Sequence, residues 1–148
     1  MENKRELFQI LTRRFGLLNK NCCQTTDAEV STIQSHILYE IHRQPHATMQ
    51  QVADVLGMDV TTFSRQIQTL VKLELVKKVP SETDRRYYHL SLTDKGVRVQ
   101  HEIDEQMTTY LEEVFAHFSE SEKQQILASI QLLNRAMSQS SVCCTPVL

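Results

Sequence analysis

The four cysteines carry the most distinctive chemistry in this chain. They occur as two adjacent pairs, Cys22 with Cys23 and Cys143 with Cys144, one near each end of the 148 residues. A disulfide within a pair would be strained, because adjacent Cα atoms lie only ~3.8 Å apart and disulfides usually join Cα atoms ~4.4–6.8 Å apart. Paired thiolates are soft ligands, and they bind thiophilic metals and metalloids such as trivalent arsenic. We therefore expect the four cysteines to form a sensor site, and we expect such a metal or metalloid to be its ligand.

Two other interpretations of the cysteines stay open. An oxidant or electrophile can convert a low-pKa thiolate into a species that a thiol of the opposite pair resolves. Lys20, close to Cys22, would favour the thiolate slightly. Alternatively, the cysteines are buried or incidental, and the effector is a small organic molecule. In none of these cases is a resident cofactor required, since the metal or metalloid would act as an effector.

A second group of residues has the chemistry of a DNA-binding surface. The stretch VTTFSRQIQTL presents hydroxyls, an amide and a cation that can bond phosphates and base edges in a major groove. These residues are Thr61, Thr62, Ser64, Arg65 and Gln68. The turn-like stretch SETDRR follows and contains Asp84, Arg85 and Arg86. An arginine at the tip of a hairpin can enter a minor groove, where the negative potential is focused.

The charge distribution points to an anionic partner for the middle of the chain only. The whole chain has a formal net charge of −2. Residues 60–98 contain eight basic and four acidic residues, a net charge of +4, and the remaining residues carry −6. A basic middle between acidic flanks is typical of a protein that binds nucleic acid through one part of its surface.

A set of short helices is expected to position these groups. Glycine and proline are scarce, with three of each, which predicts a mostly helical chain with short connections. We expect helices over about 5–19, from a cap at Thr26 or Asp27 to about 41, over 49–57 and over 60–74. Thr48 and Gln51 match a capping box for the third helix, which Gly57 would close, and Asp59 or Thr61 would cap the fourth.

The sequence period changes after the fourth helix. LVKKV and YYHLSL read as strands on either side of the turn PSETDRR, which predicts a β-hairpin. A fifth helix is expected over about 94–117 and a sixth over about 120–137, the latter starting at a capping box of Ser119 and Glu122. The expected architecture is mainly α with a small β-hairpin wing. It combines a winged helix-turn-helix domain with a helical part built from the first, fifth and sixth helices.

This order of elements resembles the MarR family of winged-helix transcriptional regulators. The resemblance covers nearly the whole chain, and its most specific part is VADVLGMDVTTFSRQIQTLVKLELVKKVPSETDRRYYHLSLTDKG. It implies a single domain over 1–148, with a DNA-binding part at 28–93 and a dimerisation part at 1–27 and 94–148. It also implies that Asp84 holds a wing arginine in place while Arg86 reaches the minor groove.

The resemblance further implies a homodimer that binds a pseudo-palindromic double-stranded DNA operator. Repression is the default of the family, so we expect a cytoplasmic repressor that a thiol-reactive signal releases from its operator. In the fold of the family, the loop after the first helix and the tail after the sixth could meet. The two cysteine pairs would then tie the geometry of the dimer to the spacing of the recognition helices.

Other functional classes receive less support from the sequence. There is no Gly-rich phosphate loop, G-x-S-x-G, H-E-x-x-H or C-x-x-C motif, so we do not expect an enzyme. There is no apolar run of ~18 residues and no secretory signal, so we expect neither a membrane span nor export. A zinc site that includes His42, His101 and Glu105 is a weaker alternative. A dimeric scaffold that binds no DNA is the other class to exclude.

Overall fold

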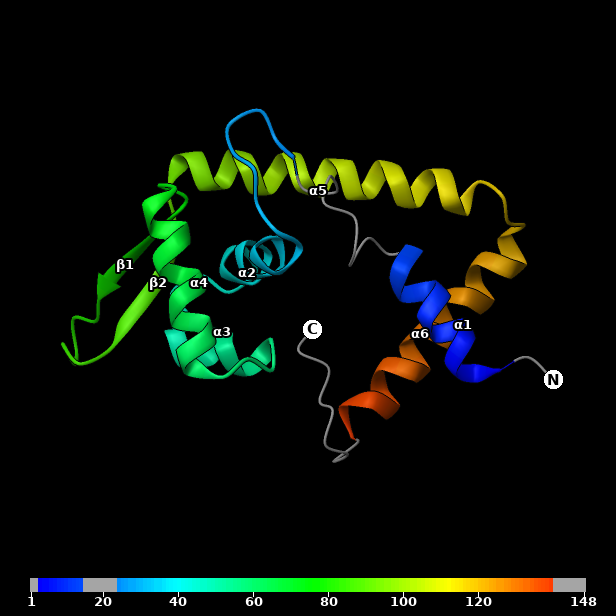
Figure 1. The fold of residues 1–148 in the computed structure, drawn as a ribbon, viewed down its shortest axis with the longest axis horizontal. Helices are drawn as coiled ribbons and strands as arrows, with labels where there is room; N and C mark the ends of the chain where they lie inside the picture. The colour runs from blue at the N-terminus through cyan, green and yellow to red at the C-terminus, as the bar shows by residue number, and fades with distance from the viewer. Residues whose placement is uncertain (1–2, 15–23, 140–148) are drawn as a thin grey trace. The chain divides into compact units, whose positions relative to one another are not determined.

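The computed structural model of the chain describes residues 3–14 and 24–139. Within these ranges the elements are α1 (Lys4–Thr12), α2 (Thr32–Arg43), α3 (Met49–Val55), α4 (Val60–Lys72), β1 (Val76–Pro80), β2 (Tyr88–Leu92), α5 (Asp94–Phe115) and α6 (Glu120–Ser138). Figure 1 shows them in this order. The predicted architecture, mainly α with one β-hairpin, is confirmed. Contacts divide the chain into a unit that ends at Ile103 and a second unit that begins at Asp104.

Side-chain caps set the start of α3 and α6 as the sequence predicts. The hydroxyl of Thr48 accepts the Gln51 N–H at 3.2 Å, and the Gln51 side chain accepts the Thr48 N–H at 2.9 Å. Ser119 and Glu122 make the same reciprocal pair at the start of α6, at 3.3 and 2.8 Å. Each pair satisfies two backbone donors that a helix start would otherwise leave without partners.

The predicted start of α2 is wrong. Neither Thr26 nor Asp27 caps the helix, because α2 begins after Ser31. The hydroxyl of Ser31 accepts the Gln34 N–H at 3.2 Å, and the Gln34 side chain accepts the Ser31 N–H at 2.9 Å. This capping box is visible in the sequence, but Thr26 and Asp27 come before it and also have the residue types of a cap.

The two misassigned residues instead join the segment 24–30 to α5. The Thr26 N–H donates to both carboxylate oxygens of Glu102 at 3.1 Å. Arg98 donates to the Asp27 carboxylate at 3.2 Å. Both contacts link positions far apart in the sequence, so no local pattern could have shown them.

The bounds of two other helices also differ from the prediction or reach the limit of what is described. α5 ends at Phe115, slightly before the predicted end near residue 117. The α-helical part of α1 ends at Thr12, whereas the sequence predicts a helix to about residue 19. Residues 15–23 lie outside the described part of the chain.

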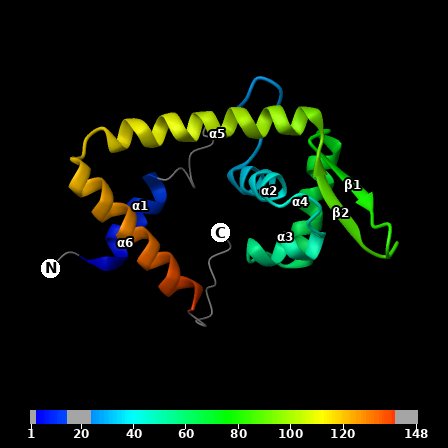
Figure 2. The ribbon, with the colours of Figure 1, turned by 180° about the vertical axis from the view of Figure 1, so that it is seen from behind.

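The hydrophobic core belongs to the first unit. α2, α3, α4, both strands and the first turns of α5 contribute to it, and Figure 2 shows α2, α3 and α4 grouped beside the hairpin. Its largest fully buried side chains include Phe63, Ile67 and Leu70 of α4 and Leu90 of β2. Ile103 of α5 is also buried, so the start of α5 is packed as part of this winged core. The functional division between residues 93 and 94 stays a prediction.

Gly96 explains why α5 can begin so close to the end of α4. A Cβ atom at this position would lie 2.0 Å from the carbonyl oxygen of Leu75, so only glycine fits. A hydrogen bond also keeps the start of α5 close to Leu75, because the Thr93 N–H donates to the Leu75 carbonyl at 3.0 Å. Lys95 adds a bond from its ammonium group to the carbonyl of Leu73 at 3.2 Å.

The hairpin pairs its two strands antiparallel, from Val76 opposite Leu92 to Pro80 opposite Tyr88. The sequence did not predict that the other edge of β2 is also paired. The Leu90 N–H donates to the carbonyl of Ala47 at 2.9 Å, and the residues just before α3 form an isolated β-bridge with β2. This contact fixes the wing relative to the helix-turn-helix.

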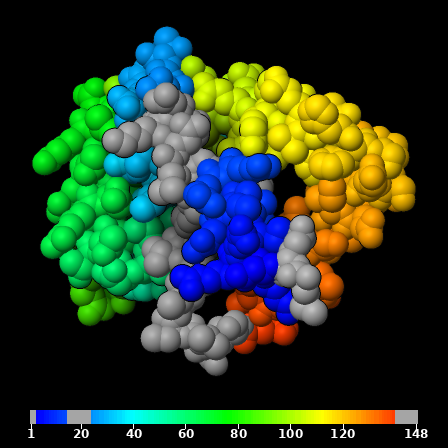
Figure 3. Space-filling model, turned by 45° about the vertical axis from the view of Figure 1, so that its right-hand side comes forward, coloured from blue at the N-terminus to red at the C-terminus, as the bar shows by residue number. Residues whose placement is uncertain are grey.

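The helices α1 and α6 contain no buried residue. Figure 3 shows much of α1, in blue, at the surface. Both helices instead expose several large apolar side chains, each to at least 37%. These are Leu7, Phe8 and Leu11 on α1, and Leu127, Ile130, Leu132, Leu133 and Met137 on α6. These apolar faces lack a covering partner among the described residues of the single chain.

Candidate nucleic-acid interface

A tight turn joins α3 to α4 and fixes the angle between them. Gly57 adopts a φ of 63°, the left-handed conformation that ends many helices. The N–H of Met58 donates to the Ala53 carbonyl at 2.9 Å, and the N–H of Gly57 donates to the Asp54 carbonyl at 3.1 Å. Together these bonds form the Schellman arrangement. The two helices therefore meet as a helix-turn-helix with α4 as its second helix.

α4 turns one face to the core and the opposite face to solvent. Phe63, Ile67 and Leu70 have no exposed surface. Gln66 accepts a bond from the Gln34 side chain of α2 at 3.2 Å, which further fixes the rotation of the helix. Four of the five predicted DNA-contacting residues of α4 are exposed, and Ser64 is half-buried. The exposed ones are Thr61, Thr62, Arg65 and Gln68.

Asp59 caps α4 and bonds Thr62 twice. The Thr62 N–H donates to Oδ1 of Asp59 at 2.9 Å, and the Thr62 hydroxyl donates to Oδ2 at 2.6 Å. These two hydrogen bonds hold the pKa of the Asp59 carboxyl below its ordinary value, and the bond from the Thr62 hydroxyl contributes most. The sequence predicts the cap but not the bond from the Thr62 hydroxyl.

At the tip of the wing, Asp84 holds Arg86 in a forked ion pair. The Arg86 guanidinium donates from Nε at 3.1 Å and from Nη2 at 2.9 Å, one bond to each carboxylate oxygen. The Arg86 N–H adds a third bond at 3.0 Å. These bonds lower the pKa of Asp84, and the guanidinium contributes more than the backbone N–H. The Arg86 side chain is nevertheless 85% exposed, so the fork orients the guanidinium without burying it.

Ser81 organises the loop that carries this pair. It is buried, its hydroxyl bonds that of Thr83 at 3.0 Å, and its N–H donates to the Tyr87 carbonyl at 2.9 Å. The Tyr87 N–H in turn donates to the Asp84 carbonyl at 3.1 Å. Ser81 supports the site but was missed from the sequence, where the only signal was a serine at the start of the turn. Arg85, in the same loop, is exposed.

The predicted sensor residues Cys22, Cys23, Cys143 and Cys144 lie outside the described residues. Over residues 3–14 and 24–139, no cluster of three or more His, Cys, Asp or Glu side chains is arranged to hold a metal ion. The alternative zinc site with His42, His101 and Glu105 thus gains no support. In the same ranges, no helix is long and apolar enough to cross a membrane.

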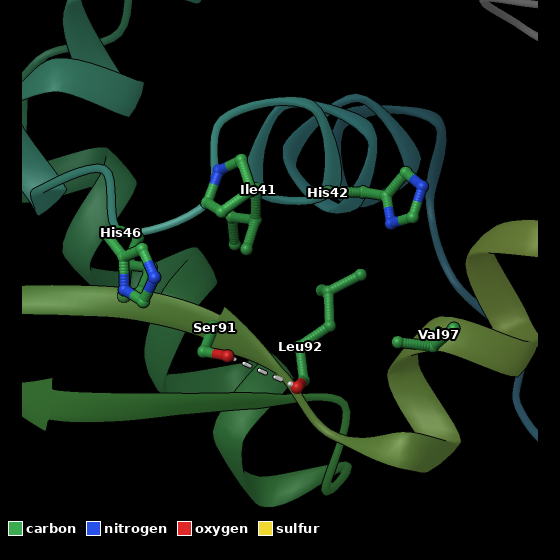
Figure 4. Close-up of a pocket in the computed structure, with 8 residues that line it drawn as sticks. Ile41, His42, His46, Ser91, Leu92 and Val97 are labelled. Carbon is green, nitrogen blue, oxygen red and sulfur yellow. Dashed lines mark hydrogen bonds between the residues drawn. The ribbon is translucent and has the colours of Figure 1, made fainter.

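The structure also contains a pocket that the sequence did not predict (Figure 4). Its volume is about 270 Å³, and it lies between the end of α2, strand β2 and the first turn of α5. His42 and His46 line it together with apolar groups such as Ile41, Leu92 and Val97. The pocket is slightly smaller than the ~300–1,000 Å³ usual for ligand sites, and the two imidazoles are among its polar groups.

Comparison with protein families and with relatives of known sequence identifies the matched region. Residues 29–86 match the model of the MarR family. The HTH-type transcriptional regulator PetP of Rhodobacter capsulatus is 32% identical over 68 residues, which cover 46% of this chain and 41% of PetP. The chain thus spans less than half the length of this relative. The uncharacterized HTH-type transcriptional regulator YybA of Bacillus subtilis is 24% identical over 109 residues, 74% of this chain and 73% of YybA.

Solved structures show that the fold extends well beyond the matched segment. FabT of Streptococcus pneumoniae, in complex with DNA, superposes with a TM-score of 0.80 at 22% identity and covers 92% of this chain and 98% of its own. The S. aureus MepR–DNA complex gives 0.78 at 17% identity, covering 93% and 99%. PcaV of Streptomyces coelicolor with its natural ligand gives 0.73 at 22% identity, covering 90% and 93%. At these identities the likeness is one of fold.

Proposed function

Through its winged-helix segment, residues 29–86, the chain belongs to the MarR family of transcriptional regulators, and on this premise we propose that it is a sequence-specific DNA-binding repressor. The observation that carries the proposal is the wing, where Asp84 holds an Arg86 guanidinium that stays exposed. α4 would enter a major groove, and Arg86 would enter the adjacent minor groove.

The proposed active form is a homodimer on a pseudo-palindromic operator. The uncovered apolar faces of α1 and α6 support it, because apolar surface of this kind gains free energy when a second copy covers it. A two-fold dimer would present two recognition helices to half-sites about one helical turn apart. FabT and MepR, which share the fold, were solved with DNA.

Replacement of Arg86 by alanine tests the wing. We expect Arg86→Ala to weaken binding to the DNA upstream of the gene by about ten- to a hundredfold, since a lost groove contact costs about 1–3 kcal/mol. The control is Arg135→Ala, which removes an equal charge from the last turn of α6. Fluorescence anisotropy with labelled DNA measures both variants. Equal affinity of the two variants would refute the wing assignment.

We propose that a thiophilic metal or metalloid releases the repressor by binding the paired cysteines. The support is chemical, because two pairs of soft thiolates suit such a ligand. It is also structural, because the segment 24–30, directly after Cys23, is bonded to α5 through Glu102 and Arg98. A change at the first pair would therefore have a short path to α5.

Cysteine variants distinguish this signal from its rivals. Reduced protein on operator DNA is exposed to trivalent arsenic, trivalent antimony, Cu(I), Cd(II), Zn(II), hydrogen peroxide and an organic hydroperoxide. We expect arsenic and antimony to release the parent but neither the Cys22→Ser/Cys23→Ser nor the Cys143→Ser/Cys144→Ser variant. Release by peroxide that dithiothreitol reverses would instead identify an oxidant sensor. Double variants that respond to arsenic like the parent would refute the cysteine site.

The pocket beside β2 supports a second candidate, a repressor released by a small organic ligand. Ligand in this pocket would contact both β2 of the wing and the start of α5. This candidate predicts release by aromatic acids that is independent of all four cysteines and is weakened by Val97→Trp, which would fill the pocket. Loss of release in the double cysteine variants would exclude it.

A further inference from the structure

Thr62 can offer DNA only one kind of hydrogen bond while it caps α4. A hydroxyl has one proton and two acceptor lone pairs. The proton of Thr62 is committed to Asp59, because the 2.6 Å contact joins the hydroxyl to Oδ2 of the carboxylate whose Oδ1 caps the helix. The lowered pKa of Asp59 keeps that carboxyl ionised near neutral pH, so it cannot be the donor. Thr62 therefore meets a ligand as an acceptor.

This state excludes the most frequent DNA partner of a threonine. Phosphate oxygens only accept hydrogen bonds, so a hydroxyl without an available proton cannot bond them. A helix start usually attracts phosphate through its open N–H groups and its dipole. Here the Asp59 carboxylate already takes the Thr62 N–H at 2.9 Å, and its negative charge repels phosphate. The Thr62 hydroxyl is thus better suited to base edges than to the phosphate backbone.

The bases differ in what they can give to such an acceptor. In the major groove adenine donates from N6 and cytosine donates from N4, whereas guanine and thymine present acceptors. We propose that Thr62, with its hydroxyl oriented by Asp59, is a specificity-determining residue that selects an adenine or a cytosine at one position of each half-site. This inference rests on the proposed DNA-binding function.

The variant Asp59→Asn is expected to free the Thr62 hydroxyl to donate a hydrogen bond to DNA, and it leaves the helix cap in place. Asparagine caps helices as well as aspartate does, with its oxygen accepting the backbone N–H. Its amide nitrogen then faces the Thr62 hydroxyl, where it donates and leaves the hydroxyl proton free. Thr62 becomes able to donate to guanine O6 or N7, to thymine O4 or to adenine N7. We expect the parental preference for adenine or cytosine at that position to be lost and guanine or thymine to be accepted.

The test is selection of bound sequences from a random DNA library by the full-length protein and four variants. Thr62→Ser keeps the hydroxyl and should keep the parental preference. Thr62→Val should lose discrimination at the same position by about three- to tenfold, the effect of one hydrogen bond. Thr69→Val is the matched control on the same helix, because the Thr69 hydroxyl donates its proton to the carbonyl of Arg65, at 3.2 Å. It should leave the preference unchanged.

The outcomes separate this inference from the function on which it rests. A parental selection that yields no enriched sequence overturns the proposed DNA binding itself. Enrichment in which Asp59→Asn and Thr62→Val keep the parental base at every position overturns the role of Thr62 alone. A uniform loss of affinity for all sequences in Thr62→Val would show a backbone contact, and it would overturn the role of Thr62 as well. Circular dichroism of each variant checks that the helical fold is retained.

Discussion

α4 and α6 are both capped and both amphipathic, with 13 and 19 residues respectively, yet they differ in what covers them. Phe63, Ile67 and Leu70 of α4 are completely buried within the winged core. On α6, by contrast, Leu127 is 50% exposed and Leu132 is 65% exposed. Local sequence is therefore enough to specify a helix and its apolar face. It does not say whether the surface that covers this face comes from the same chain or from another one.

The largest expected effect is in the winged core. Phe63→Ala should lower the free energy of unfolding by about 3–5 kcal/mol, because a fully buried aromatic ring leaves a cavity. Urea denaturation at a fixed protein concentration measures it. The control is Tyr87→Ala, which truncates a ring that is 57% exposed and should change the free energy of unfolding by about 0.5 kcal/mol or less. Similar losses in both variants would contradict a self-contained core.

The next effect concerns α6. Leu132→Glu should raise the dissociation constant of the proposed dimer by about a hundredfold, because a charge at an apolar interface costs several kcal/mol when unpaired. The control is Gln131→Glu, which adds the same charge at the adjacent exposed position. Sedimentation equilibrium measures both dissociation constants. If the two values are equal, the apolar face of α6 does not form the dimer interface.

The smallest effect is a dependence on pH that both regions share. Hydrogen bonds lower the pKa values of Asp84 in the wing and Glu122 in α6. For Asp84 the largest contribution comes from the Arg86 side chain, and for Glu122 it comes from the Ser119 backbone N–H. A depressed pKa stabilises the folded state above about pH 4, the unfolded value, and this contribution is lost as the pH falls through the folded value. Both regions should therefore lose stability in acid.

The variant Glu122→Gln isolates the contribution of α6 to this loss of stability in acid. Glutamine keeps the capping box but cannot titrate, so the melting temperature of this variant should fall less than that of the parent between about pH 5 and pH 3. Thermal unfolding followed by circular dichroism gives the comparison. Parallel curves for parent and variant would show that the cap of α6 contributes nothing to the acid sensitivity.

The parts of the fold that were predictable depend on neighbours in the sequence. The capping boxes of α3 and α6 join residues three positions apart, and the wing lies between two strands with a clear period. The start of α2 was missed because Thr26 bonds Glu102, a residue 76 positions away. The pairing of Leu90 with Ala47 was missed for the same reason.

For the candidate site, the sequence predicts residue types and faces better than hydrogen-bonding states. The exposed positions of α4 follow from the period of its apolar residues. The spacing of Asp59 and Thr62 is that of an ordinary cap, and only the coordinates show that the hydroxyl of Thr62 is also bound. Likewise, the support that Ser81 gives to the wing depends on a loop closure that the sequence alone does not contain.

The glycine at the start of α5 has a mechanical consequence. At Gly96 the helix α5 packs directly against the backbone of Leu75, with no room for a methyl group between them. The first turn of α5 cannot roll or slide without carrying along the connection between α4 and β1. That connection follows the last turn of α4, so a displacement of the first turn of α5 would also displace the end of α4.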